Sequence, residues 1–167
     1  QVANLSTAQI AAIETGDIKS ITTAALRNLS TAQIDALTSD QLRALTSTQL
    51  NALTTAPQVS GITTSDLNSL STGQLATLST TQVQALTSTQ LANLSTDNLN
   101  ALGTAQFATL SSAQFGALTT GQLAKLETAD LRAVTTAALN ALGSAQVAAL
   151  ASDAVGAMST AQIAPLG

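Results

Sequence analysis

The residues of this chain best suited to chemistry are two short clusters of carboxylates, each followed by a cation. Residues 14–19 read Glu-Thr-Gly-Asp-Ile-Lys, and residues 127–132 read Glu-Thr-Ala-Asp-Leu-Arg. Paired carboxylates could bind a cation or transfer protons. The alternative, which we favour, is that these carboxylates stabilise helix ends and pair locally with Lys19 or Arg132.

Other catalytic groups are scarce. The chain has no Cys and no His, which removes thiol chemistry, imidazole bases and most zinc sites. Ser and Thr are abundant, but Lys19 and Lys125 lie in no recognised serine–lysine motif that would activate a hydroxyl. We therefore expect neither an enzyme nor a cofactor.

The composition indicates a chain that can bury apolar surface and that carries few charged or aromatic residues. It is 45% hydrophobic, 8% charged and 1% aromatic, whereas an average domain is about a quarter charged. Leu, Ile, Val and Ala must supply the core. A net charge of −4 with five Lys+Arg argues against nucleic acid. No apolar run approaches the roughly 20 residues of a membrane span, so we expect no membrane insertion.

An eight-residue repeat, the octad, must position these residues. Residues 29–36 read Leu-Ser-Thr-Ala-Gln-Ile-Asp-Ala, and residues 37–44 read Leu-Thr-Ser-Asp-Gln-Leu-Arg-Ala. Numbered from the first Leu, positions 1 and 6 are apolar throughout, and position 3 is Ser or Thr from residue 7 to residue 160. Position 2 is usually Ser or Thr, position 5 mostly Gln and position 8 mostly small. The pattern predicts one array over residues 1–167, with a one-residue register shift at 56–57.

The spacing of apolar residues, alternately five and three, decides the fold class. Residues five apart lie on opposite faces of a strand, and one continuous helix would rotate its apolar stripe by about 80° per octad. Each octad is therefore expected to form a helix of about six residues and a two-residue corner. One octad buries too little apolar surface to be stable alone, so octads must stack. We predict an all-α solenoid of very short capped helices; the alternative is a β-solenoid, which the Thr content favours.

The hydroxyls at positions 2 and 3 are candidate helix caps, because Ser and Thr accept bonds from free backbone N–H groups at helix starts. The hydroxyl at position 3 persists where position 2 becomes Glu, Gly or Ala, which favours position 3. The predicted caps in the first half of the chain are Thr7, Thr15, Thr23, Thr31, Ser39, Ser47 and Thr55. The alternative is a capping box between position 2 and the Gln at position 5.

Caps at position 3 would leave a ladder of Thr hydroxyls at position 2 facing solvent. Its members are Thr22, Thr38, Thr46, Thr54, Thr63, Thr87, Thr119 and Thr135. A flat Thr ladder could bind ice. The alternative, which we favour, is that these hydroxyls suit a tight corner. Scatter of the position 2 hydroxyls around the circumference would exclude the ice-binding hypothesis.

Runs such as Leu-Ser-Thr-Ala-Gln-Ile and Leu-Thr-Ser-Thr-Gln-Leu resemble octapeptide arrays of large bacterial secreted or surface-exposed proteins. The resemblance covers nearly the whole chain. It implies an extracellular or cell-surface location and a structural or adhesive role, and it transfers no functional residues.

The ends of the chain bear on its partners. Both fall within an octad, and neither carries the polar capping repeat that solenoids need for solubility. We expect either a fragment whose partners are neighbouring segments of a longer array, which we favour, or a chain that stacks end to end on itself. The expected function is a non-catalytic spacer or fibre-forming segment; the alternative is a binding module that uses the Ser/Thr ladder.

Overall fold

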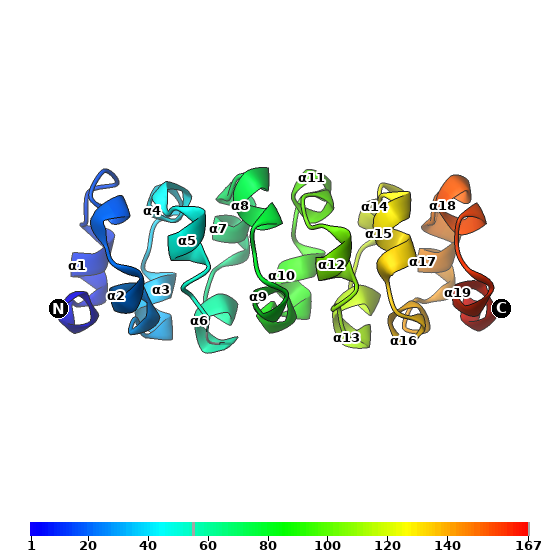
Figure 1. Cartoon of the computed structure of the whole chain (residues 1–167), viewed down its shortest axis with the longest axis horizontal. Helices are drawn as coiled ribbons and strands as arrows, with labels where there is room; N and C mark the ends of the chain where they lie inside the picture. Colours follow the sequence, from blue (N-terminus) through cyan, green and yellow to red (C-terminus); the bar gives the residue numbers. More distant parts are fainter. Residues whose placement is uncertain (55, 167) are drawn as a thin grey trace. The chain divides into compact units, whose positions relative to one another are not determined.

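The computed structural model describes the backbone of residues 1–54 and 56–166, which contain helices, corners and no strand. Within these residues the α-helices are four to six residues long and follow one another once per octad (Figure 1), except that a 3-10 helix occupies the second octad. None of the described helices has the length and apolar character that a membrane crossing requires. The predicted all-α solenoid of short helices is confirmed.

Two compact units make up the chain, residues 1–86 and 87–167. Unit 1 contains η1 (Val2–Asn4), α1 (Thr7–Ala11), η2 (Ile18–Ser20), α2 (Thr23–Arg27), α3 (Thr31–Asp35), α4 (Ser39–Ala44), α5 (Ser47–Leu50), α6 (Ala56–Ser60), α7 (Thr64–Ser69), α8 (Thr72–Ala76) and α9 (Thr80–Ala85). Unit 2 contains α10 (Ser88–Ala92), α11 (Thr96–Asn100), α12 (Thr104–Phe107), α13 (Ser112–Gly116), α14 (Thr120–Ala124), α15 (Thr128–Ala133), α16 (Thr136–Leu139), α17 (Ser144–Ala149), α18 (Ser152–Gly156), α19 (Thr160–Ile163) and η3 (Ala164–Leu166). That all 167 residues act as one array stays a prediction.

Within each unit, helices stack on the helix three octads later. In unit 1, α3 contacts α6, α4 contacts α7 and α6 contacts α9. In unit 2, α12 contacts α15, α13 contacts α16 and α14 contacts α17. Three octads therefore complete one turn, and within each unit the helices form three stacked rows.

The core consists of the apolar side chains at positions 6 and 1, as the sequence predicts. Leu42 and the following Leu45 are 0% and 3% exposed, and Phe107 and Phe115 are both 0% exposed at position 6. Small residues let stacked helices approach closely. A Cβ added to Gly61, at position 8, would lie 2.6 Å from Thr31 Cγ2 on the stacked α3.

Corners arise from two extended residues, at positions 1 and 2. Leu45 ends α4 with φ −60° and ψ 135°, and Thr46 precedes α5 with φ −69° and ψ 158°. The buried side chain at position 1 thus belongs to a corner residue. The predicted length of the corner, two residues, is confirmed, but the corner lies at positions 1 and 2 and not at positions 2 and 3.

The prediction that position 3 caps the helices is wrong. Thr7, Thr23, Thr31, Ser39 and Ser47 are the first residues inside α1 to α5. The residue before each of them is the cap, and its hydroxyl accepts the backbone N–H of position 5; Thr38, for example, accepts from Gln41 N at 3.3 Å. The physical reason is the capping box, which needs a Gln three residues after the cap and so selects position 2.

The remaining predicted caps differ for separate reasons. Thr15 lies in a turn, and the N-cap of η2 is Asp17, without a side-chain cap. Thr55 lies outside the described residues. Position 2 also tolerates glycine, because Gly103 N and Gly143 N still donate to Gln106 Oε1 and Gln146 Oε1 at 2.6 and 2.8 Å. Pro57 is the second residue of α6.

A matched pair of substitutions tests this assignment. Thr119 caps α14 and Thr120 begins it, and both side chains are exposed. Thr119→Ala should lower the free energy of unfolding by about 1 kcal/mol, because it removes an N-cap. Thr120→Ala should change it by less than about 0.5 kcal/mol. Urea denaturation of both variants checks this; a larger loss for Thr120→Ala would restore position 3 as the cap.

Candidate functional site

The most elaborate group of interactions in the chain surrounds the Gln at position 5. In α4, Gln41 Oε1 accepts the backbone N–H of Thr38 at 2.8 Å, which completes the capping box. The Nε2 of the same side chain donates to the carbonyls of Ile10, Ala11 and Ile13 at 3.0, 3.2 and 2.7 Å. Gln41 is 1% exposed. One buried side chain therefore starts its own helix and joins it to the previous turn.

This arrangement, which we call the glutamine ladder, recurs along both units. In every case Nε2 donates to backbone carbonyls 28 to 32 residues earlier, at distances of 2.6 to 3.3 Å. In unit 1 its members are Gln33, Gln41, Gln49, Gln58, Gln74 and Gln82. In unit 2 they include Gln122, Gln146 and Gln162.

The shared acceptor of the ladder is the carbonyl at position 1. Ile13 O and Leu53 O accept Gln41 Nε2 and Gln82 Nε2 at 2.7 and 2.9 Å. Position 1 has an extended backbone, so its carbonyl points away from the N–H groups of its own helix. A buried carbonyl without a donor costs about 1–3 kcal/mol. A Gln at position 5 could bond from turn to turn or to the first turn of its own helix, and in the structure Gln41 does both.

In two octads a buried Asp stands at position 5 in place of the Gln. An ionised carboxylate accepts hydrogen bonds and cannot donate them. Asp66 is 9% exposed and accepts from Ser39 Oγ at 2.5 Å and from Thr63 Oγ1 at 2.6 Å. The hydroxyl of Ser39 lies on the previous turn and is the donor, whereas in the glutamine ladder the later turn donates to the earlier one. The position 3 hydroxyls of Ser88 and Ser112 also reach across turns, to the carbonyls of Ala113 and Ala137 at 3.0 and 2.8 Å.

Asp130 is the second buried carboxylate, and it is 4% exposed. Burial, with a smaller contribution from the negative charge of Glu127, raises the pKa of Asp130 from 3.8 to about 6. Glu127 precedes α15 without a side-chain cap bond, while Arg132 lies in the last turn of that helix. The acidic start and basic end agree with the helix-end interpretation of this cluster.

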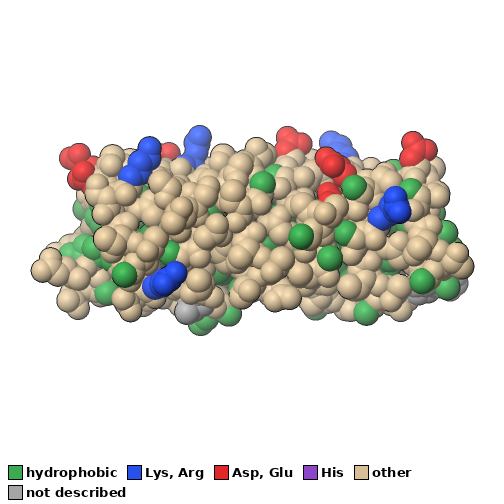
Figure 2. Space-filling model, in the orientation of Figure 1, with side chains coloured by type: hydrophobic (Ala, Val, Ile, Leu, Met, Phe, Trp, Pro, Cys, Tyr) green, Lys and Arg blue, Asp and Glu red, His purple; other side chains and the backbone are tan. Residues whose placement is uncertain are grey.

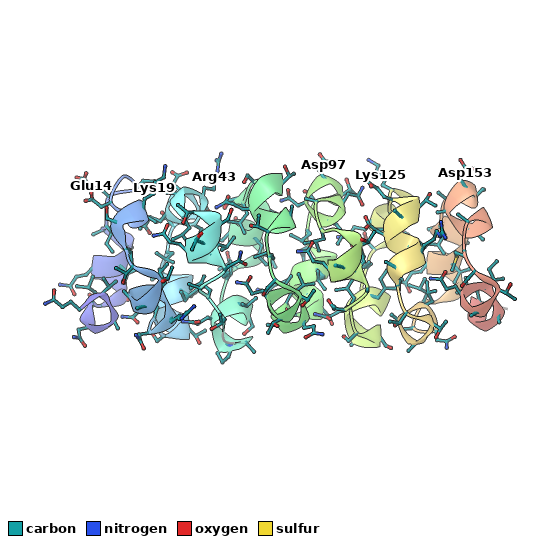
Figure 3. The ribbon with its side chains drawn as sticks, viewed as in Figure 1. Glu14, Lys19, Arg43, Asp97, Lys125 and Asp153 are labelled. Atoms are coloured by element: carbon teal, nitrogen blue, oxygen red, sulfur yellow. The ribbon has the colours of Figure 1, made fainter. Side chains whose placement is uncertain are left out.

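The carboxylates of the first cluster lie at the surface of unit 1. Glu14 and Asp17 are exposed, and in Figure 3 Glu14 and Lys19 project outward from one edge of unit 1, as Arg43 does. Within the described part of the chain, no group of three or more His, Cys, Asp or Glu side chains is placed to hold a metal. Figure 2 shows that most of the charged side chains visible in this view lie along its upper edge, and that most of the remaining visible surface is uncharged.

The eight Thr side chains of the predicted ladder are all exposed, but they do not share one face. In unit 1, Thr22 and Thr46 cap the stacked pair α2 and α5, whereas Thr38 and Thr63 cap the stacked pair α4 and α7. Thr54 precedes α6, which belongs to the third row. Hydroxyls spread over three rows argue against an ice-binding face.

Most of these Thr hydroxyls already have a partner. Thr22, Thr38, Thr46, Thr63, Thr87, Thr119 and Thr135 each accept the backbone N–H of position 5. Their shared role is to start a helix. The structure therefore supports the alternative interpretation, in which the hydroxyls suit a tight corner.

Comparison with known proteins identifies the repeat. The ALTTAQ repeat matches residues 10–47, 59–96, 96–126 and 123–160, which together cover most of the chain. Its six letters correspond to position 8 of one octad followed by positions 1 to 5 of the next, as in residues 117–122, Ala-Leu-Thr-Thr-Gly-Gln. These positions supply the small contact residue, the corner, the cap and the ladder. No curated protein matches the chain.

The pKa of Asp130 leads to a prediction about stability. Because the folded chain holds this proton more tightly than the unfolded chain, the free energy of unfolding should fall as pH rises from about 4 to about 6. Asp130→Gln should remove this contribution and raise the free energy of unfolding at pH 7 by about 1–2 kcal/mol, allowing for solvent screening. Urea denaturation at several pH values measures it.

Asp97→Asn is the matched control, since it removes one carboxylate from an exposed position in the first turn of α11. It should leave the pH dependence between about 4 and 6 essentially as in the parent chain. An unchanged pH dependence in Asp130→Gln would contradict the assignment.

Proposed function

We propose a function for this chain from one premise: it belongs to the ALTTAQ repeat family, whose repeat matches most of its residues. The family supports a repeat-based structural or interaction region. We infer, more specifically, a non-catalytic segment that acts as a stiff spacer or fibre-forming region of a bacterial secreted or surface protein.

The observation that carries this proposal is the glutamine ladder. The same donors and acceptors join successive turns in both units, for example Gln41 to Ile13 and Gln122 to Leu94, at 2.7 and 2.8 Å. Stability in such a solenoid is a sum of similar nearest-neighbour contacts. Repetition of one contact suits a part that sets length and stiffness, whereas a catalytic site requires one differentiated turn.

The chemistry of the side chains supports a non-catalytic role. Hydroxyls that could serve as nucleophiles accept backbone N–H groups at helix starts, as Thr38 and Ser111 do. The chain has no His or Cys to activate them. The extracellular or surface location rests on the resemblance to octapeptide arrays of secreted bacterial proteins.

Stiffness is testable by pulsed electron–electron spin resonance, because the chain has no native Cys. Spin labels would be attached to Ala32→Cys in unit 1 and Ala145→Cys in unit 2, both exposed positions. A stiff spacer predicts one narrow distribution of distances between the labels. A flexible tether predicts a broad distribution.

The control pair is Ala105→Cys with Ala145→Cys, which lies inside unit 2 and shares one label site with the test pair. Its distribution sets the width expected for a rigid body. A test distribution several times wider than this control would overturn the stiff spacer.

A further inference from the structure

Backbone carbonyls at positions 6, 7 and 1 of one turn converge on a single point, where the Gln of the next turn places its amide nitrogen. Gln162 marks this point in unit 2. Its Nε2 lies 3.2, 3.0 and 2.9 Å from the carbonyl oxygens of Leu131, Arg132 and Val134. Gln41 marks it in unit 1, at 3.0, 3.2 and 2.7 Å from three carbonyl oxygens. The point therefore requires a group that attracts oxygen atoms.

In the octad of α15 a carboxylate takes the place of this amide. Asp130 stands at position 5, and α15 stacks on α12 as elsewhere in unit 2. Gln122 donates to the carbonyls 31 and 28 residues before it. The same separations from Asp130 lead to Leu99 and Leu102, with Asn100 at position 7 between them. The carbonyls of Asn100 and Leu102 accept no bond from a described residue, so oxygens meet oxygens at this point.

The Asp130 carboxylate has no hydrogen-bond partner among the described residues, although it is only 4% exposed. Asp66, the other buried Asp at position 5, accepts from the hydroxyls of Ser39 and Thr63. The residue of α15 that corresponds to Thr63 is Glu127, which has no hydroxyl. Burial, and then the charge of Glu127, raises the pKa of Asp130 to about 6. At pH 7 the group is mostly ionised and cannot donate to the carbonyls.

Asn100 contributes a further oxygen without a partner. Its Oδ1 is buried and makes no hydrogen bond, while its Nδ2 donates to Lys125 O at 2.8 Å. Lys125 is the last residue before the octad of α15, so this bond holds the Asn100 side chain beside the start of that octad. The side chains of Lys125 and Arg132 are exposed, and neither forms an ion pair with Asp130 in the described part of the chain. No protein cation therefore compensates these oxygens.

We propose that these oxygens form a calcium site between two turns of unit 2. The ligands are the Asp130 carboxylate, the carbonyls of Leu99, Asn100 and Leu102, and Asn100 Oδ1, with water completing the shell. The cation takes the place of the Gln amide as the group that joins the two turns. Most of its ligands are backbone or amide oxygens, so the site needs no cluster of carboxylates. The stiff spacer does not depend on it.

The spacing and charge of the oxygens favour Ca²⁺ over other cations. Ca²⁺ takes six to eight oxygen ligands at about 2.3–2.6 Å in flexible geometry, whereas Mg²⁺ requires a near-ideal octahedron at about 2.0–2.1 Å. Carbonyls that hold an amide nitrogen at 2.7 to 3.2 Å, as around Gln41, contract slightly for Ca²⁺ and much more for Mg²⁺. The exposed carboxylate of Glu127 adds a second negative charge nearby, which favours a divalent ion.

The test is urea denaturation of the full chain at pH 7, first in chelator-treated buffer and then with Ca²⁺ added. A site with one direct carboxylate ligand belongs to the weak class, with a Kd of about 0.1–1 mM. About 10 mM Ca²⁺ should therefore raise the ratio of folded to unfolded chain about 10- to 100-fold. Mg²⁺ at the same concentration should raise it much less, because the oxygens are too far apart for its shell.

Two variants assign the effect to this site. Asp130→Gln supplies the amide of the glutamine ladder, so it should fold well and lose the response to Ca²⁺. Asp40→Asn removes one exposed carboxylate from the first turn of α4 in unit 1 and should respond like the parent chain. A parent chain that Ca²⁺ does not stabilise, an equal response in Asp130→Gln, or an equal response to Mg²⁺ would refute the calcium site.

Discussion

The carbonyl at position 1 of each octad is the group on which the rest of the structure depends. It belongs to an extended corner residue that directly precedes an N-cap, and no N–H of its own helix can reach it. It is also buried, since the side chain beside it belongs to the core, as at Leu45 and Leu53. Buried backbone carbonyls are almost always paired. The donor comes from the Gln of a later turn, so each corner depends on a neighbour to be stable.

The same Gln side chain couples this long-range bond to the local one. Its Oε1 completes the capping box that starts its own helix, and its Nε2 satisfies the corner of the previous turn. Helices of four to six residues are unstable in isolation. Helix formation and turn stacking therefore reinforce one another in each octad. Asp66 shows how far the pattern can vary, because it keeps a bond between turns only by reversing its direction.

Much of this fold could be predicted from the sequence, because apolar spacing reports directly on burial. The buried positions 1 and 6, the small position 8 and the length of the corner follow from that pattern. The cap was misassigned because the persistence of a hydroxyl at position 3 cannot distinguish a cap from the first helical residue. The Gln three residues after Thr38 was the signal that could have decided it. Three octads per turn depend on the backbone angles at corners such as Leu45 and Thr46, which side-chain types do not specify.

The sequence left the partners of the Gln side chains undecided for a related reason. A Gln every eight residues has the same spacing whether its amide bonds locally, to the next turn or to water. The buried environments of Asp66 and Asp130 likewise appear only when turns are stacked, although both residues stand out in the sequence as replacements for Gln. The sequence repeat identifies which octads carry Asp in place of Gln, and the packing of the turns determines what surrounds that Asp.

The central claim is that glutamine bonds between turns hold the octads together, and Gln122→Met tests it most directly. Met matches the size of Gln but removes both the capping acceptor and the donor to Leu91 and Leu94. Gln9→Met loses only the capping acceptor, since Gln9 has no described partner on another turn. Urea denaturation should show Gln122→Met less stable than the parent by about 2–4 kcal/mol, and Gln9→Met by about 1 kcal/mol or less. Equal losses for the two variants would contradict the account.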